Sequence, residues 1–163
     1  MKKRIIAVLA ICAFASMSFG QLKEGSLGIS PGISFGPTHN TQTIGIAYAV
    51  TNDIRLDGDI GFTTISDNYT SFALTVGGAY YLWKVDDINT FVSGGFGIAS
   101  TSYSSSYLGS DVSEFGLTGK MGAEYNFSPR FSINGTVGLE LNLGSGHTRF
   151  GTITGSALTW WFK

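Results

Sequence analysis

Apolar residues recur at every second position along most of this chain, in segments separated by turn-forming residues. In the segment 43–50, for example, Ile44, Ile46 and Tyr48 alternate with small residues. A spacing of two places such residues on one face of a β-strand, whereas an amphipathic helix needs a spacing near 3.6. Beyond residue 20 the longest purely apolar runs contain five residues, and a membrane-spanning helix needs about 20. A sheet protein is therefore expected, and any membrane-spanning part must consist of strands.

The face opposite the apolar one consists mainly of Gly, Ala, Ser and Thr, and the chain contains 23 glycines. Charged residues make up only 13% of the chain, against about 25% in a typical soluble domain. The small residues cannot fill an apolar core, so we expect them to line a narrow polar lumen while the apolar face contacts lipid. The alternative is a soluble barrel of the lipocalin type, which needs the opposite arrangement of the two faces.

Eight alternating segments follow one another along the chain: 26–35, 43–50, 54–63, 71–82, 89–99, 115–127, 131–142 and 148–162. Pro31 has no backbone donor, so we expect a bulge or kink in the first of them. Short turns at 51–53, 83–87 and 128–130 alternate with longer connections, among them a Ser-rich loop over 100–112. The predicted fold is all-β: an eight-stranded antiparallel up-and-down transmembrane β-barrel, with the short turns on the periplasmic side.

Aromatic residues gather at both ends of the predicted strands. The end with the short turns carries Tyr48, Tyr80, Trp83, Tyr125, Phe127, Phe131, Trp160 and Phe162. The end with the longer connections carries Phe35, Phe62, Phe72, Phe96, Phe115 and Phe150. Two such girdles are typical of the two interfaces of a membrane, and they support the same orientation as the lengths of the turns.

The N-terminus predicts export. Basic residues at 2–4 precede an apolar run at 5–15, and small residues precede Gln21. This pattern is typical of a signal peptide over residues 1–20, which leaves 21–163 as the barrel. The eleven apolar residues are too few for a membrane anchor. A lipoprotein modification at Cys12 needs a small residue before it, and Ile11 is not small.

The last predicted strand has an amphipathic aromatic pattern, because Leu158, Trp160 and Phe162 share one face. It resembles the closing strand of bacterial outer-membrane β-barrels, except that Lys163 follows the last aromatic residue. The chain as a whole resembles the small outer-membrane β-barrel family, which includes OmpA-type membrane domains, OmpX-like proteins and related porin-family barrels. The resemblance implies a monomer without cofactors in the lipid of the bacterial outer membrane. It also implies that the barrel-assembly machinery recognises the C-terminal strand through Trp160 and Phe162.

The charge balance excludes nucleic acid as a partner. Without the three cations at residues 2–4, seven basic side chains face eleven acidic ones. Six charged residues fall on the small-residue face and would share the lumen: Arg55, Asp57, Asp59, Lys120, Glu124 and Glu140. Unpaired charges are unfavourable in so narrow a space, so we expect an ion-paired network that plugs the lumen. The alternative is a narrow path for cations.

Enzymatic motifs are weak in this chain. Residues 32–36 match the pattern of a nucleophile elbow, but that motif requires a strand-to-helix turn and here it lies inside an alternating segment. His39, Ser145 and His147 fall in predicted loops, with no spacing typical of a catalytic pair or a metal site.

Tyr103 and Tyr107, in the Ser-rich loop, could form a contact surface for a protein or glycan. The sequence therefore predicts a small non-enzymatic outer-membrane barrel with a structural or surface-interaction role and a largely plugged lumen. A narrow porin-like channel for ions or small solutes is the alternative. A lipid-modifying enzyme of the outer membrane is the third hypothesis.

Overall fold

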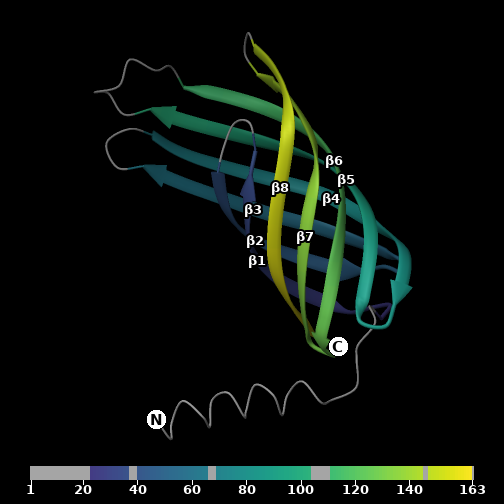
Figure 1. The fold of residues 1–163 in the computed structure, drawn as a ribbon. Coiled ribbons are helices and arrows are strands. Elements are labelled where there is room, and N and C mark those ends of the chain that lie inside the picture. Colours follow the sequence, from purple (N-terminus) through teal and green to yellow (C-terminus); the bar gives the residue numbers. More distant parts are fainter. Residues whose placement is uncertain (1–22, 37–39, 66–68, 104–110, 145–146, 163) are drawn as a thin grey trace, which may run out of the picture.

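The computed structural model describes residues 23–36, 40–65, 69–103, 111–144 and 147–162. They form eight strands: β1 (Leu27–Phe35), β2 (Asn40–Ala49), β3 (Ile54–Ile65), β4 (Tyr69–Val85), β5 (Ile88–Tyr103), β6 (Val112–Ser128), β7 (Phe131–Gly144) and β8 (His147–Phe162). Each strand pairs antiparallel with the next, and β8 pairs back with β1, so the sheet closes into a barrel (Figure 1). The predicted eight-stranded up-and-down barrel is confirmed. Within the described ranges no helix is long and apolar enough to cross a membrane.

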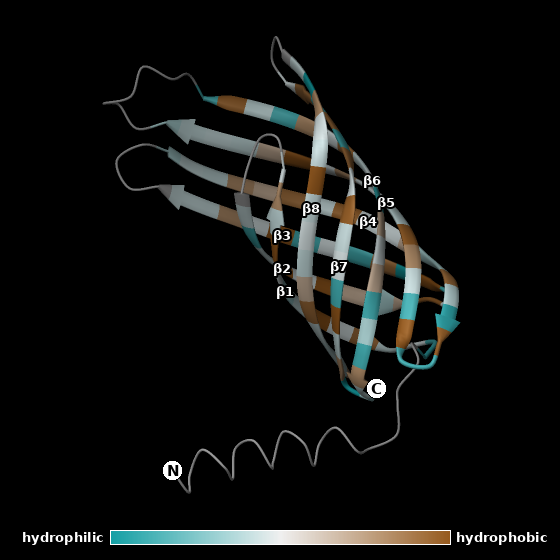
Figure 2. Cartoon of the chain, in the orientation of Figure 1, coloured by the Kyte–Doolittle hydropathy of each residue, from teal (hydrophilic) through white to brown (hydrophobic). Residues whose placement is uncertain are grey.

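The two faces of the sheet are arranged as the alternation predicts. Phe72, Leu74 and Val76 of β4 point outward and are 46%, 40% and 47% exposed, whereas Ser71 and Thr75 point into the barrel. Figure 2 shows the resulting change between apolar and polar residues along each strand. A soluble barrel would bury its large apolar side chains, so the lipocalin-type alternative is excluded.

The connection predicted over 83–87 is wrong in length. β4 continues to Val85 and β5 begins at Ile88, which leaves a two-residue turn. Asp86 in this turn has a φ of 51°, a left-handed conformation that Asp adopts more readily than most residues. The hairpin is therefore tighter than the sequence suggests.

The Ser-rich loop predicted over 100–112 is also wrong at both ends, because β5 runs to Tyr103 and β6 begins at Val112. Thr101 pairs with Val112 in the ladder, and its hydroxyl donates to the Ser71 hydroxyl at 3.1 Å. Ser and Thr resemble loop residues in composition, but in this sheet they extend the strands.

Pro31 does not produce the expected bulge in the β1–β2 ladder, where it pairs directly with Ile44. Its effect is on the other side of the strand: within the described chain, no bridge joins Ser30 and Pro31 to β8. Register shifts lie elsewhere, at Tyr81–Trp83 in β4 and at Asn126–Ser128 in β6.

The aromatic side chains at the turn end form a continuous row on the outside of the barrel. The ring centroids of Phe127 and Phe131 lie 6.0 Å apart, those of Phe131 and Trp160 5.9 Å, and those of Trp160 and Phe162 4.6 Å. The row therefore joins β6, β7 and β8, and it corresponds to part of the predicted girdle on the side of the short turns.

Candidate functional site

The turn end of the lumen is filled by a cluster centred on Arg55. The alternation of β3 places Arg55 and Asp57 two positions apart on the inner face, and Arg55 Nε lies 2.8 Å from Asp57 Oδ1. Arg55 Nη1 lies 2.9 Å from Glu124 Oε2 on β6 and donates to the Tyr81 hydroxyl on β4 at 2.6 Å. The Tyr81 hydroxyl in turn donates to Glu124. One guanidinium therefore joins side chains from three strands.

The second carboxylate oxygen of Glu124 is also bonded. Ser132 on β7 donates its hydroxyl to Glu124 Oε1, and the indole Nε1 of Trp161 on β8 donates to the Ser132 hydroxyl at 3.0 Å. Glu124 is 1% exposed and Ser132 is fully buried. A buried carboxylate is tolerated when its oxygens are bonded to this extent. We call Arg55, Asp57, Tyr81, Glu124, Ser132 and Trp161 the plug cluster.

Aromatic rings pack around the plug cluster. The guanidinium carbon of Arg55 lies 5.3 Å from the ring centroid of Phe91 and 5.6 Å from that of Tyr81. The apolar part of this core contains Ala47, Ala49, Ala79, Tyr81, Phe91 and Trp161. Planar rings and small residues together fill the turn end of the space that the eight strands enclose.

Two glycines make room for these rings. A Cβ at Gly122 would lie 2.7 Å from the ring of Phe91, and a Cβ at Gly28 would lie 2.9 Å from the ring of Trp161. Both distances are far shorter than a normal carbon contact. The glycines on the inner face are therefore required by packing at these two positions.

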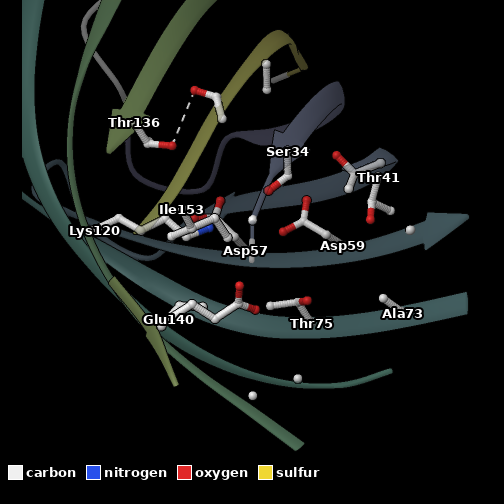
Figure 3. A pocket seen from close by; sticks show the side chains of 18 of the residues that line it. Ser34, Thr41, Asp57, Asp59, Ala73, Thr75, Lys120, Thr136, Glu140 and Ile153 are labelled. Atoms are coloured by element: carbon white, nitrogen blue, oxygen red, sulfur yellow. Dashed lines mark hydrogen bonds between the residues drawn. The ribbon is translucent and has the colours of Figure 1, made fainter. Parts of the chain in front are cut away.

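A polar cavity of ≈ 220 Å³ lies on the loop side of the plug cluster. Arg55 and Phe91 form part of its wall, and Asp59, Lys120 and Glu140 point into it from β3, β6 and β7 (Figure 3). The remaining lining is largely hydroxyl groups and glycines. Side chains thus fill one half of the lumen, and the other half contains the cavity.

The six predicted lumen residues divide between these two halves. Arg55, Asp57 and Glu124 are joined in the plug cluster. In the part of the chain that the structure describes, no ion pair within 4 Å joins Asp59, Lys120 or Glu140 to another residue. Direct ion pairs therefore join three of the six residues, and the other three line the cavity.

Sequence reasoning missed Tyr81, Ser132 and Trp161 as partners of Glu124. The alternation along each strand contains this information, because all three residues fall at positions whose side chains point inward. The sequence analysis also did not predict an ion pair at the loop end of the barrel, where Arg149 Nη1 lies 3.8 Å from Glu114 Oε1.

The other candidate residues lie away from the plug cluster. Trp160 and Phe162 lie on the outside, in the aromatic row. Tyr103 is the last residue of β5, half-buried, with its ring 6.0 Å from that of Tyr69 and its backbone N–H donating to Asp111. Tyr107, like His39 and Ser145, lies outside the described residues.

The residues that resemble catalytic motifs do not lie in a catalytic arrangement in the described part of the chain. Residues 32–36 span the end of β1 rather than a strand-to-helix turn, and His147 begins β8 instead of lying in a loop. Among the described residues no group of three His, Cys, Asp or Glu side chains could hold a metal ion.

Solved structures share this fold. The chain is similar to the N-terminal β-barrel domain of OprF from Pseudomonas aeruginosa, with a TM-score of 0.62 and 13% identity, covering 86% of this chain and 100% of that one. It is also similar to Neisserial surface protein A, with a TM-score of 0.58 and 13% identity over 84% and 95% of the two chains. A de novo designed barrel, TMB2.3, gives a TM-score of 0.52 and 14% identity over 88% and 98%.

No curated protein shows significant sequence similarity to the chain. The family described as outer membrane protein beta-barrel domain matches residues 7–158. The match covers most of the chain, and the closed barrel with an apolar outer face and a polar lumen agrees with it. The chain therefore belongs to the outer membrane protein beta-barrel domain family.

Proposed function

We propose that this chain is a small non-enzymatic outer-membrane protein with a structural or surface-interaction role, whose lumen is closed on the periplasmic side. The observation that carries the proposal is the buried contact of Arg55 with Glu124, sealed by Tyr81 and Ser132. The interior of an eight-stranded barrel is so narrow that side chains alone can fill it. A solute could pass only after the Arg55–Glu124 pair separates, which leaves both charges uncompensated.

Export and assembly are part of the same proposal. Residues 1–20 direct export and are removed, and the barrel-assembly machinery recognises the outward aromatic side chains Trp160 and Phe162. Membrane fractionation and N-terminal sequencing of the mature protein test this. We expect the protein in the outer membrane with Gln21 as its first residue. Recovery of an uncleaved chain, or of soluble periplasmic protein, would contradict it.

The absence of enzymatic activity needs a test of its own. The elbow-like residues 32–36 form part of β1 and its end, which supports a non-catalytic role. Overexpression should leave the composition of the outer-membrane lipids unchanged when it is compared with that of cells carrying an empty vector. A shortened or newly acylated lipid that appears only with the wild-type chain would favour the lipid-modifying hypothesis instead.

A second candidate function is a narrow path for cations. It is favoured by the cavity in which Asp59, Glu140 and Lys120 stand without an ion pair among the described residues. Excess carboxylates along a hydrated path attract cations. This function requires the plug cluster to open, so it predicts steady cation-selective current through the wild-type protein.

A further inference from the structure

The cavity on the loop side of the plug cluster has an excess of negative charge. Asp59, Lys120 and Glu140 line it, and none of them has an ion pair within 4 Å among the described residues. Lys120 lies within electrostatic range of both carboxylates, so one ammonium group serves two negative charges. Arg55 does not supply the missing positive charge, because its ion pairs are those of the plug cluster.

Asp59 is the carboxylate with the fewest partners. Glu140 has a hydrogen bond with the amide of Asn142. The side chain of Asp59 is half-buried, and no hydrogen bond or ion pair joins it to another residue that the structure describes. A carboxylate in a narrow, partly desolvated space is unfavourable without a counter-charge or hydrogen-bond donors. The chemistry of the cavity therefore calls for a cationic donor next to Asp59.

Glycines on neighbouring strands hold polar side chains of the cavity close to its wall. Asp59 faces Gly45 across the β2–β3 ladder, and its carboxylate occupies the space that a Cβ at Gly45 would need. Asn142 faces Gly116 in the same way across the β6–β7 ladder, and a Cβ there would lie 2.6 Å from Asn142 Oδ1. A methyl group at either glycine would push the facing side chain toward the centre of the lumen. The two glycines therefore keep the cavity open, in contrast to the filled turn end.

We propose that this cavity binds a small solute with a primary ammonium group, and that Asp59 is the residue that binds this group. A protonated amine supplies the missing positive charge and donates three hydrogen bonds, which are strong when the acceptor is a carboxylate. Thr75 faces Asp59 across the β3–β4 ladder and adds a hydroxyl to the same wall (Figure 3). Such hydroxyl groups suit the polar remainder of the solute.

Other ligands fit the cavity less well. An anion would meet the excess of carboxylates, and an apolar solute would leave the charged groups without partners. Among the described residues no group of three His, Cys, Asp or Glu side chains could hold a metal ion. A volume of ≈ 220 Å³ also exceeds that of a single ion several times, since one water molecule takes up about 30 Å³. Binding does not require the plug cluster to open, so the proposal is independent of whether the lumen conducts.

A titration of the protein in phosphatidylcholine nanodiscs, followed by amide chemical shifts in NMR spectra, tests the site. Ethanolamine is the probe, and ethylene glycol is a neutral control of similar size. We expect saturable shifts around Asp59 with ethanolamine and none with ethylene glycol. Equal responses to the two compounds would overturn the proposal. Potassium chloride at the same concentrations is a third arm, and a response equal to that of ethanolamine would reduce the site to one for a simple counterion and would also overturn it.

Two variants separate the site from the fold. Asp59→Asn removes the charge at nearly constant size, and we expect the affinity for ethanolamine to fall by about tenfold or more. Gly45→Ala leaves every charge in place but displaces the Asp59 carboxylate, so it should weaken binding as well. Gly58→Ala is the matched control, because it lies on β3 and nothing is within 4 Å of the added methyl group, and it should bind like the wild type.

Wild-type affinity in folded Asp59→Asn and Gly45→Ala, judged by well-dispersed NMR spectra, would show that the proposal is wrong. If a variant does not fold, the comparison of ethanolamine with ethylene glycol on the wild-type protein still decides the matter.

Discussion

Arg55 on β3 and Glu124 on β6 are 69 positions apart in the sequence, yet their side chains meet at 2.9 Å inside the barrel. Arg55 is 6% exposed and Glu124 is 1% exposed. A buried pair of this kind matters most when one member is removed, because the other is left as an uncompensated charge in a medium of low dielectric constant. The proposed closure of the lumen and the stability of the barrel therefore depend on the same contact.

Replacement of Glu124 should be costly. We expect Glu124→Ala to lower the free energy of unfolding by about 3 to 5 kcal/mol, because Arg55 loses a buried partner. Urea unfolding in lipid vesicles, followed by tryptophan fluorescence, measures the change. Glu140→Ala is the matched control, since Glu140 lines the cavity and has no ion pair among the described residues. Equal losses for the two variants would show that the plug cluster has no special role.

The close packing of Phe91 against β6 gives a prediction with a control on the same strand. Gly122→Ala places a methyl group 2.7 Å from the ring of Phe91, and overpacking of this kind costs about 1 to 3 kcal/mol. Gly119→Ala faces outward with nothing within 4 Å of the added methyl, and we expect it to be neutral or slightly stabilising. Unfolding midpoints of the two variants in the same vesicles make the comparison. A larger loss for Gly119→Ala would reverse the assigned faces of β6.

Arginine on the outer face tests which residues meet hydrocarbon. Leu74→Arg lies near the middle of the apolar band and should lower the free energy of unfolding by about 2 to 4 kcal/mol. Ser102→Arg also faces outward, but near the loop end of β5, where the cost falls to about 0 to 1 kcal/mol. Folding yield in vesicles and urea titration give both values. Similar behaviour of the two variants would mean that the membrane lies elsewhere on the barrel.

The fold could be predicted from the sequence because a spacing of two is repeated in every strand. The ends of the strands were harder to predict. Ser and Thr at 100–103 resemble loop residues in composition, but in the structure Thr101 belongs to β5 and its hydroxyl bonds to that of Ser71 on β4. The turn that contains Asp86 was predicted in the right place but too long, because residues 83–85 fit either a strand or a loop by composition alone.

The candidate site was only partly predictable. The alternation along the strands predicted that Arg55 and Glu124 lie on the inner face. It does not give the angular position of each strand around the barrel, or how far each side chain extends into the lumen. Those two factors decide that Arg55 meets Glu124 and that Lys120 points into the cavity with no direct ion pair among the described residues. Trp161 was overlooked because its neighbours Trp160 and Phe162 carry the outward signal, while the indole of Trp161 points inward to Ser132.

Current through the wild-type protein in planar bilayers tests the closed lumen most directly. With Arg55 held by Glu124, we predict no steady conductance at moderate voltage, whereas Glu124→Ala, if it still inserts, should give measurable current. Protein-free bilayers and heat-denatured protein provide the baseline. Steady, cation-selective openings of the wild-type protein would contradict the account and would favour the narrow cation path instead.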